Sequence, residues 1–234
     1  MRRIATHTSR CHITSMRRRD LLLLLSCCGP SVMPLATSRA ATAGPAPIVL
    51  TPAEQVELDS IAAYLNSLTT LKAKFLQVAP DGSVSQGIAW LERPGRMRFQ
   101  YDPPSPYLLV AGHGLLVFHD SSLDQTTNIP LSSTPLGVLL ARHIVLSGPI
   151  TVTAFQQLPG EIDLTVVRTG SPGAGSLTLV FSTPPLTLRQ WAVRDAQGKV
   201  TRVTLYNVEL GGHFAGHLFT YIPSSPPGGN ANGN

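Results

Sequence analysis

The 234-residue chain carries 18 lysine and arginine residues against 13 acidic ones, a formal net charge of +5 at pH 7. Seven of the basic residues but only one acid, Asp20, lie in the first 40 positions, so residues 41–234 hold 18 − 7 = 11 basic and 13 − 1 = 12 acidic residues, a net charge of −1. The positive charge therefore belongs to the N-terminal segment, and a basic surface for nucleic acid is excluded for the rest of the chain.

The first 40 residues have the parts of an export signal. Arginines at 17–19 precede an apolar run that starts at Leu21 and continues loosely to Leu35, and small residues suited to cleavage follow at 38–43. The run is shorter than the roughly 20 apolar residues that a membrane-spanning helix needs. We therefore expect a cleaved export signal over residues 1–40 and a periplasmic location.

Two details of this segment bear on its export route and its start. The arginines are followed by Asp20 and two leucines, which resembles a twin-arginine signal and would mean export in the folded state. Met16 is a candidate for the true start, because residues 1–15 add nothing that an export signal needs.

All three cysteines, Cys11, Cys27 and Cys28, lie in this same segment. The mature chain would therefore contain neither a disulfide nor a thiolate metal site. Residues 24–27, Leu-Leu-Ser-Cys, loosely resemble a lipobox. Lipidation of Cys27 would make the chain membrane-anchored, and this alternative stays open beside soluble export.

Composition divides the remaining chain into three parts. Residues 41–50 are rich in alanine and proline and predict a linker. Residues 51–223, about 170 in number, suit one domain with a single core. Residues 224–234 consist of Pro, Gly, Ser, Asn and Ala, which predicts a disordered tail.

The predicted domain opens with one helix. Thr51-Pro52-Ala53-Glu54 is a capping box with proline at the first helical position, where a missing N–H costs nothing. An apolar stripe at near-helical spacing should follow and pack on an apolar surface. Its expected members are Val56, Ile61, Leu65 and Leu68.

Nearly everything after this helix alternates between apolar and polar residues, as half-buried strands do. Short turns separate the runs, so neighbouring strands should pair antiparallel. A short apolar helix is also predicted, at Thr134–Arg142, again beginning Thr-Pro. The predicted strands are 71–78, 85–91, 96–101, 107–110, 115–119, 125–128, 150–156, 162–168, 176–181, 188–195 and 200–209.

A sheet of this many strands curls, and its concave face must be filled by side chains, helices or a ligand. Two short helices leave room for a lipophilic cavity on that face. A fully packed core is the other outcome compatible with the pattern. The fold class we expect is mainly β with short helices (α+β), built on a single curled antiparallel sheet.

Several sequence blocks occur in a characteristic order, including Gly87-x-x-Trp90-x-x-Arg93-Pro94. They resemble the outer-membrane lipoprotein carrier (LolA-like) family, in which this Gly-x-x-Trp-x-x-Arg-Pro block is the most characteristic feature. The resemblance covers nearly all of 51–223. The other blocks are Phe75–Gln77, Asp81–Gly82, Phe99–Pro104, Leu109–Gly114, Thr134–Leu136, Leu188–Asp195 and Phe219–Pro223.

The resemblance implies an unclosed β-barrel covered by a helical lid that carries triacylated lipoproteins across the periplasm. The implied partners are acylated lipoproteins, an inner-membrane lipoprotein-releasing transporter and an outer-membrane acceptor. We expect a monomer that needs no cofactor and no metal. The alternatives are a membrane-anchored receptor of the same fold, should Cys27 be lipidated, and a carrier of another lipid such as a glycolipid or hopanoid.

The resemblance also assigns residues. Arg93 matches the family arginine that hydrogen-bonds the lid and keeps the empty cavity closed, so we expect it to act as a lid latch. Alternation places Arg96 and Arg98 toward solvent. The residues expected to line the lipid cavity are Trp90, Met97, Phe99, Tyr101, Leu109, Phe118, Leu136, Leu139 and Leu140.

An enzyme is the alternative from a different class. His113, His119, Asp120 and Asp124 lie close in sequence, as acid–base or metal-binding groups would. No serine or cysteine nucleophile motif lies near them, and solvated turn residues explain them as well. We therefore expect no catalytic residues and no metal ligands.

Overall fold

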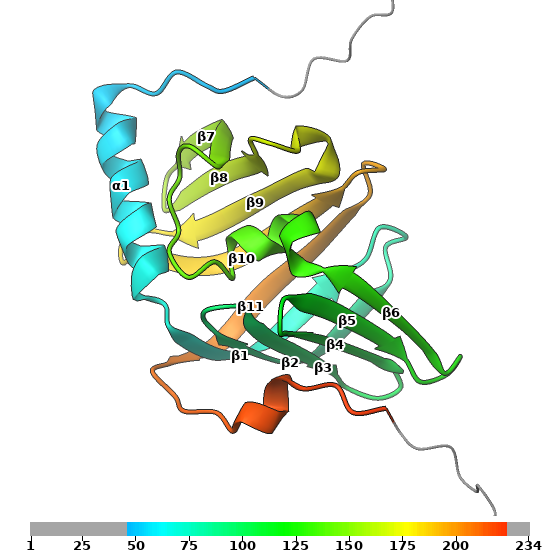
Figure 1. Ribbon diagram of the computed structural model, residues 1–234. Coiled ribbons are helices and arrows are strands. Elements are labelled where there is room, and N and C mark those ends of the chain that lie inside the picture. The colour runs from blue at the N-terminus through cyan, green and yellow to red at the C-terminus, as the bar shows by residue number, and fades with distance from the viewer. Residues whose placement is uncertain (1–45, 224–234) are drawn as a thin grey trace, which may run out of the picture. The chain divides into compact units, whose positions relative to one another are not determined.

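The computed structural model describes residues 46–223 (Figure 1). The predicted export signal with Met16 and Cys27, residues 41–45 of the predicted linker and the predicted tail at 224–234 lie outside the described residues. Residues 46–50 precede the first helix, and the Ile48 backbone N–H donates to the carbonyl of Val152 at 3.2 Å. Within 46–223 no helix is long and apolar enough to cross a membrane.

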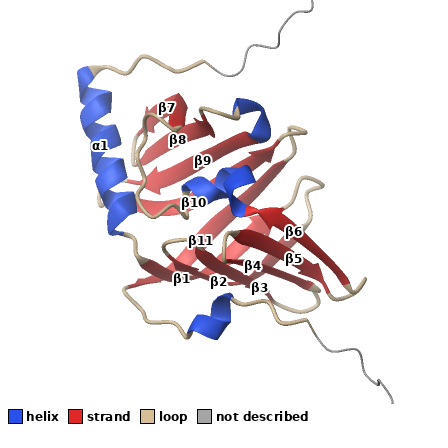
Figure 2. Cartoon of the chain, viewed as in Figure 1, coloured by secondary structure: helices blue, strands red, loops and turns tan. Residues whose placement is uncertain are grey.

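The described chain forms one 11-stranded antiparallel sheet, as predicted, with one α-helix and short helical turns (Figure 2). Each predicted strand is present. The strands are β1 (Thr70–Val78), β2 (Val84–Glu92), β3 (Arg96–Tyr101), β4 (Tyr107–Gly112), β5 (Leu115–Asp120), β6 (Gln125–Pro130), β7 (Ile150–Leu158), β8 (Glu161–Arg168), β9 (Gly175–Ser182), β10 (Thr187–Asp195) and β11 (Val200–Leu210).

The sheet is an unclosed barrel, because its order β6-β5-β4-β3-β2-β1-β11-β10-β9-β8-β7 leaves β6 and β7 as unpaired edges. These two edges are consecutive in sequence, so the chain between them has to pass from one edge of the sheet to the other. Residues 131–149 make this passage, and we call them the crossing segment. Several of their side chains are buried with the inward side chains of the sheet, so the segment covers the concave face.

Helix α1 (Pro52–Ser67) begins with the predicted capping box: the Thr51 hydroxyl accepts from the Glu54 N–H at 3.3 Å, and the Glu54 carboxylate accepts from the Thr51 N–H at 2.7 Å. Its buried residues are Leu58, Ile61 and Leu65. The predicted member Val56 is wrong, being 66% exposed. Val56 lies five residues before Ile61, about 140° around the helix, whereas Leu58 lies three residues before it and shares its face.

The short helix predicted at Thr134–Arg142 begins with Thr134 and Pro135 as expected, but it is of the 3₁₀ type and ends at Val138. Two 3₁₀ turns stand there, η1 (Leu131–Ser133) and η2 (Pro135–Val138). The Thr134 hydroxyl caps η2 by accepting from the Gly137 N–H at 3.3 Å. A glycine in the second turn weakens helix propagation, and the chain continues irregularly to β7. The cover over the sheet therefore consists of α1 and of the crossing segment with its two short 3₁₀ turns.

The remaining short turns lie outside this cover. Turn η3 (Pro172–Ala174) joins β8 to β9, and η4 (Gly216–Phe219) follows β11. The η4 turn packs on β3 and β4. Phe219 is buried there, and its carbonyl oxygen lies so close to Gly112 of β4 that no side chain would fit at that glycine.

Candidate functional site

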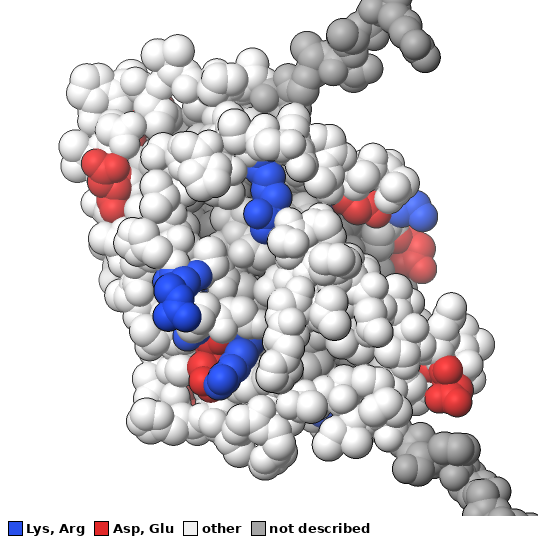
Figure 3. Space-filling model, in the orientation of Figure 1, with Lys and Arg blue, Asp and Glu red and all other residues white. Residues whose placement is uncertain are grey.

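An apolar cavity of about 410 Å³ lies between the concave face of the sheet and the start of the crossing segment. Strands β3, β4, β10 and β11 form one wall, and residues 133–136 form the other. Four of the predicted cavity residues line it, namely Met97, Phe99, Leu109 and Leu136. In the view of Figure 3, charged side chains are few and are scattered over the surface.

Four other predicted cavity residues lie on the concave side but do not line this cavity. Tyr101 and Phe118 each pack against Tyr107, with ring centroids 5.9 Å and 5.4 Å away. Leu139 and Leu140 are buried in the core, each 2% exposed. All four side chains therefore pack against other side chains of the protein, and their contact with a ligand stays a prediction.

The placement of Trp90 contradicts its assignment to the cavity. In β2 the buried residues Ala89 and Leu91 face the core, and Trp90 between them points to the opposite face. Its neighbours across the sheet are Lys72 on β1 and Arg98 on β3. Every second residue of a strand lies on the same face. Trp90 therefore lies on the outer face because of its position in β2, although its indole ring is apolar.

Strands β1, β5, β10 and β11 supply cavity residues beyond those predicted. Trp191 and Val193 of β10 and Val203 of β11 line the cavity, together with Leu116 of β5 and the polar Gln77 of β1. Trp191 also meets Phe99 edge-on, with ring centroids 6.0 Å apart. The alternation within each strand marks these residues as inward, but only the pairing of β1 with β11 brings the two halves of the wall together.

Arg93 lies at the end of β2 between α1 and the crossing segment. Its guanidinium donates to backbone carbonyls of the crossing segment, at Ala141 (2.9 Å) and Arg142 (3.2 Å). It also donates to carbonyls at the end of α1, at Leu65 and, at 3.4 Å, Leu68. All these acceptors are neutral. Partial burial lowers the pKa of Arg93 from its ordinary value. Within residues 46–223 Arg93 has no ion pair with a carboxylate, so the dipoles of these carbonyl groups stabilise its charge.

Asn66 completes this junction. The Arg93 guanidinium donates to its Oδ1 at 3.3 Å. The same side chain pairs with the backbone of Ile144, accepting from its N–H and donating to its carbonyl, both at 2.9 Å. On the other side of Arg93, the Gly95 N–H donates to the carbonyl of Leu140 at 2.9 Å. Residues 140–144 are thus fixed to α1 and to the turn after β2.

A second arginine holds the beginning of the crossing segment. Arg168, the last residue of β8, donates through Nε and Nη2 to the carbonyl of Thr134, at 3.4 Å and 3.3 Å. Gly137 lies against the Arg168 guanidinium and the Leu131 carbonyl oxygen. A Cβ atom added at Gly137 would be too close to both groups, at 2.6 Å from the Arg168 Nη2 and closer still to the oxygen. No motif in the sequence singles out Arg168.

Arg96 and Arg98 of β3 lie on the outer face of the sheet. Arg96 is exposed and pairs with Glu92 at 2.8 Å, as a solvent-facing residue. Arg98 is partly buried under η4, where it donates to the Leu218 carbonyl at 3.2 Å, so its predicted exposure is wrong. The segment after β11 covers it, and alternation along β3 carries no information about that segment.

A hydrogen bond joins Tyr101 to Gln77 beside the cavity. The Tyr101 hydroxyl donates to Oε1 of Gln77 at 2.9 Å. Burial raises the pKa of Tyr101 to about 12, although its hydrogen bond to Gln77 partly opposes this shift. The phenol is therefore a neutral donor at physiological pH, which holds the amide oxygen of Gln77 toward Tyr101.

The residues considered for catalysis do not form a reactive group. His119 contacts the hydroxyls of Thr126 (3.1 Å) and Tyr221 (3.0 Å) through Nδ1. Asp120 accepts from the N–H and hydroxyl of Ser122 in a turn. Within residues 46–223 no cluster of three or more His, Cys, Asp or Glu side chains is arranged to hold a metal ion.

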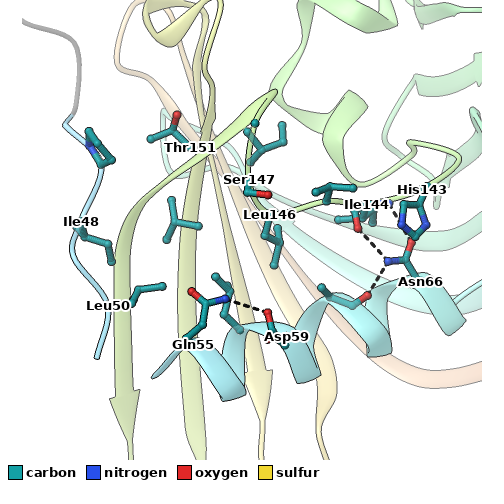
Figure 4. A pocket seen from close by; sticks show the side chains of 17 residues that line it. Ile48, Leu50, Gln55, Asp59, Asn66, His143, Ile144, Leu146, Ser147 and Thr151 are labelled. Atoms are coloured by element: carbon teal, nitrogen blue, oxygen red, sulfur yellow. Dashed lines mark hydrogen bonds between the residues drawn. The ribbon is translucent and has the colours of Figure 1, made fainter. Parts of the chain in front are cut away.

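A second pocket of about 520 Å³ lies between α1, the end of the crossing segment and β7 (Figure 4). Leu50, Ile144 and Leu146 contribute apolar surface, whereas Gln55 and Asp59 contribute polar groups and bond to one another at 2.9 Å. Its lining is thus more polar than that of the 410 Å³ cavity. We regard the smaller, apolar cavity as the candidate site for an apolar ligand.

The fold and the cavity together define an unclosed β-barrel with an internal apolar site. A family model described as "Outer membrane lipoprotein carrier protein LolA" matches residues 66–222. The chain therefore belongs to the outer membrane lipoprotein carrier protein family, as its sequence blocks predicted.

Two relatives in sequence agree with this assignment. The outer-membrane lipoprotein carrier protein of Methylococcus capsulatus is 28% identical over 186 residues, covering 76% of this chain and 87% of that protein. The protein of the same name from Chromohalobacter salexigens is 25% identical over 172 residues, covering 70% and 81%. A solved LolA superfamily protein from Nitrosomonas europaea aligns with a TM-score of 0.40 at 10% identity, covering 70% of this chain and 97% of that one.

Proposed function

We propose that this protein is a non-enzymatic periplasmic carrier. It shelters the acyl chains of lipoproteins, or of related lipids, in the 410 Å³ cavity and delivers them toward the outer membrane. The observation that carries the proposal is the apolar cavity enclosed by Met97, Phe99 and Leu136 in a chain of the lipoprotein carrier family. The export signal predicted over residues 1–40 supports a periplasmic location.

The energy of hydration explains why such a cargo needs a carrier. Removing one methylene group from water is worth about 0.8 kcal/mol, so one 16-carbon chain approaches roughly 12 kcal/mol. A methylene group fills about the volume of one water molecule, roughly 30 Å³, so a cavity of 410 Å³ holds about 14 of them. This corresponds to slightly less than one such chain. A triacylated cargo therefore requires the crossing segment to move away from the sheet.

The same hydration energy would prevent release if nothing opposed binding. Arg93 supplies an opposing contribution in this proposal, since it holds the closed, empty state through Ala141 and Arg142 of the crossing segment. A hydrogen bond from a charged donor contributes about 1.5–3 kcal/mol. Arg93 is then the latch whose contacts are lost on loading and regained on release.

The partners follow from the family. We propose that the carrier receives acylated lipoproteins from an inner-membrane lipoprotein-releasing transporter and passes them to an outer-membrane acceptor. A membrane-anchored receptor of the same fold is the second candidate, favoured by the lipobox-like residues that end at Cys27. Incorporation of radiolabelled acyl groups that depends on Cys27 would identify the receptor, and its absence would identify the soluble carrier.

Native mass spectrometry of the protein purified from periplasm tests the carrier function. We expect a mass increment equal to an acylated lipoprotein or another acyl lipid. A protein that is reproducibly empty, and that also fails to bind an added triacylated lipoprotein, would contradict the proposal. An increment equal to a glycolipid or hopanoid would identify a carrier of that lipid instead.

A further inference from the structure

The polar side chains of the 410 Å³ cavity differ in whether they already have hydrogen-bond partners. Ser133 and Thr134 donate to the carbonyls of Pro130 (2.7 Å) and Leu131 (3.0 Å). Asp195 accepts from two backbone N–H groups of its own turn, each at 2.9 Å. These three groups are satisfied locally and are not available to a ligand.

Three polar side chains of the wall remain. Gln197 is exposed to solvent in the turn after β10, whereas Gln77 and Thr201 are partly buried. Tyr101 occupies the amide oxygen of Gln77, so the Nε2 donor of Gln77 is left for the cavity. The Thr201 hydroxyl also lines the cavity and has no hydrogen-bond partner among residues 46–223. Gln77 pairs with Val203 across β1 and β11, and Thr201 lies two residues before Val203 on the same face. The two free donors are therefore diagonal neighbours on one wall.

These donors lie at one end of the cavity. Gln77 of β1 is bonded to Tyr101 at the end of β3. Met97 lies four residues before Tyr101 on β3, which is a separation of about 13 Å at the rise of a strand. Leu116 lies at the level of Met97, because both pair with Ala111. The exposed turn between β10 and β11 borders the cavity. The cavity thus has one end lined by Met97 and Leu116 and another end, near the exposed turn, that offers two hydrogen-bond donors.

From this polarity we infer that Gln77 and Thr201 bind the ester or amide carbonyl oxygens of an acyl cargo, with the hydrocarbon directed toward Met97 and Leu116. The inference rests on the proposed carrier function. The chemistry fits, because an acyl carbonyl is an acceptor without a donor, and Gln77 Nε2 and the Thr201 hydroxyl are donors without an acceptor. A carbonyl buried among apolar groups would otherwise lose its hydrogen bonds to water.

Two lipopeptides of equal hydrocarbon content test this inference. The first is a tripalmitoylated S-glyceryl-cysteine peptide, and the second carries ether links in place of its two glyceryl esters. We expect the wild-type protein to bind the ester-linked peptide about five- to tenfold more tightly, as one or two net hydrogen bonds would produce. The preference should vanish in the double variant Gln77→Leu/Tyr101→Phe, which removes both partners of the buried bond and so leaves no unsatisfied group in the core.

Controls separate the possible results. Tyr101→Phe alone keeps the Gln77 amide in the wall and should retain the preference. Thr201→Val changes only a hydroxyl to a methyl group and should reduce the preference, which keeps the test decisive if the double variant does not fold. A wild-type preference below twofold, or a preference that survives in the double variant, overturns this inference while leaving the carrier function intact. If wild type binds neither peptide, the carrier function itself fails.

Discussion

Asn66, in the last turn of α1, pairs with the backbone of Ile144 in the crossing segment through two hydrogen bonds of 2.9 Å. The two residues are 78 positions apart in sequence. The Asn66 side-chain amide thus donates to the carbonyl of Ile144 and accepts from its N–H, as a residue of a neighbouring β-strand would. It therefore fixes the position of the crossing segment relative to the helix rather than merely covering apolar surface.

Replacing Asn66 with leucine should destabilise the fold. Both backbone groups of Ile144 would lose their partner, and a buried polar group left unsatisfied costs about 1–3 kcal/mol. Urea unfolding followed by circular dichroism measures this loss. Ser60→Ala is the matched control, because the Ser60 hydroxyl bonds only to its own helix, at the Val56 carbonyl, and should change stability by less than about 0.5 kcal/mol. Equal losses in the two variants would contradict the role given to Asn66.

Replacing Arg93 with leucine tests the latch. The closed, empty state would lose its bonds to Ala141 and Arg142, whereas the loaded state would lose little. We expect cargo to be retained, with delivery slowed about tenfold for each 1.4 kcal/mol of lost closure energy. The measurement is the rate at which a labelled lipoprotein moves from the carrier to acceptor membranes.

Arg96→Leu is the control for the latch, since Arg96 lies on the outer face and pairs only with Glu92. It removes the same charge three residues away and should deliver cargo at the wild-type rate. Delivery by Arg93→Leu as fast as by wild type would exclude the latch. Equal slowing in both variants would instead point to an effect of net charge.

Local pattern predicted most of this fold, and long-range pairing decided the rest. The strands follow from alternation within each run, and Met97 and Phe99 were placed correctly because the parity of β3 is unambiguous. Trp90 was misplaced because its position in a family block was given more weight than its parity in β2. Asn66 and Arg168 were missed, because each acts on a segment at least 34 residues away that no local pattern identifies.

Asp163 makes stability depend on pH. This β8 carboxylate lies on the outer face, and its Oδ1 is buried without a hydrogen-bond partner in the described chain. Burial raises the pKa of Asp163 above its ordinary value of 3.8. The unfolded chain therefore ionises first, so the contribution of Asp163 to stability is fully present below 3.8 and is lost as the pH rises through the folded-state pKa.

Asp163→Asn should consequently stabilise the protein at neutral pH and have little effect below pH 3.8. We expect a gain of no more than about 0.5 kcal/mol in the free energy of unfolding at neutral pH, because solvent screens this partly exposed carboxylate. Denaturant titrations of wild type and variant, at neutral pH and below pH 3.8, measure the difference in the free energy of unfolding. Glu161→Gln, an exposed carboxylate on the same strand, is the control. A gain that is the same at both pH values would rule out ionisation as its cause.

The last prediction concerns Gly137, which lies between η1 and the Arg168 guanidinium. A methyl group there would be too close to both the Leu131 carbonyl oxygen and the Arg168 Nη2. Arg168 can swing away, but the carbonyl is backbone and cannot, so Gly137→Ala should shift η2 and break the bond from Arg168 to Thr134. Overpacking of this kind typically costs about 1–3 kcal/mol.

Two measurements follow the consequence for the cavity. Thr134 and Leu136 form its wall opposite Trp191, so movement of η2 should change the fluorescence of Trp191 and admit an apolar dye more readily. Gly173→Ala is the matched control, because Gly173 also lies in a 3₁₀ turn but an added Cβ there has no neighbour within 4 Å. Dye uptake that rises in Gly137→Ala and not in Gly173→Ala would show that the start of the crossing segment gates the cavity. Unchanged uptake in Gly137→Ala despite lower stability would place the gate elsewhere, at the Arg93 end of the segment.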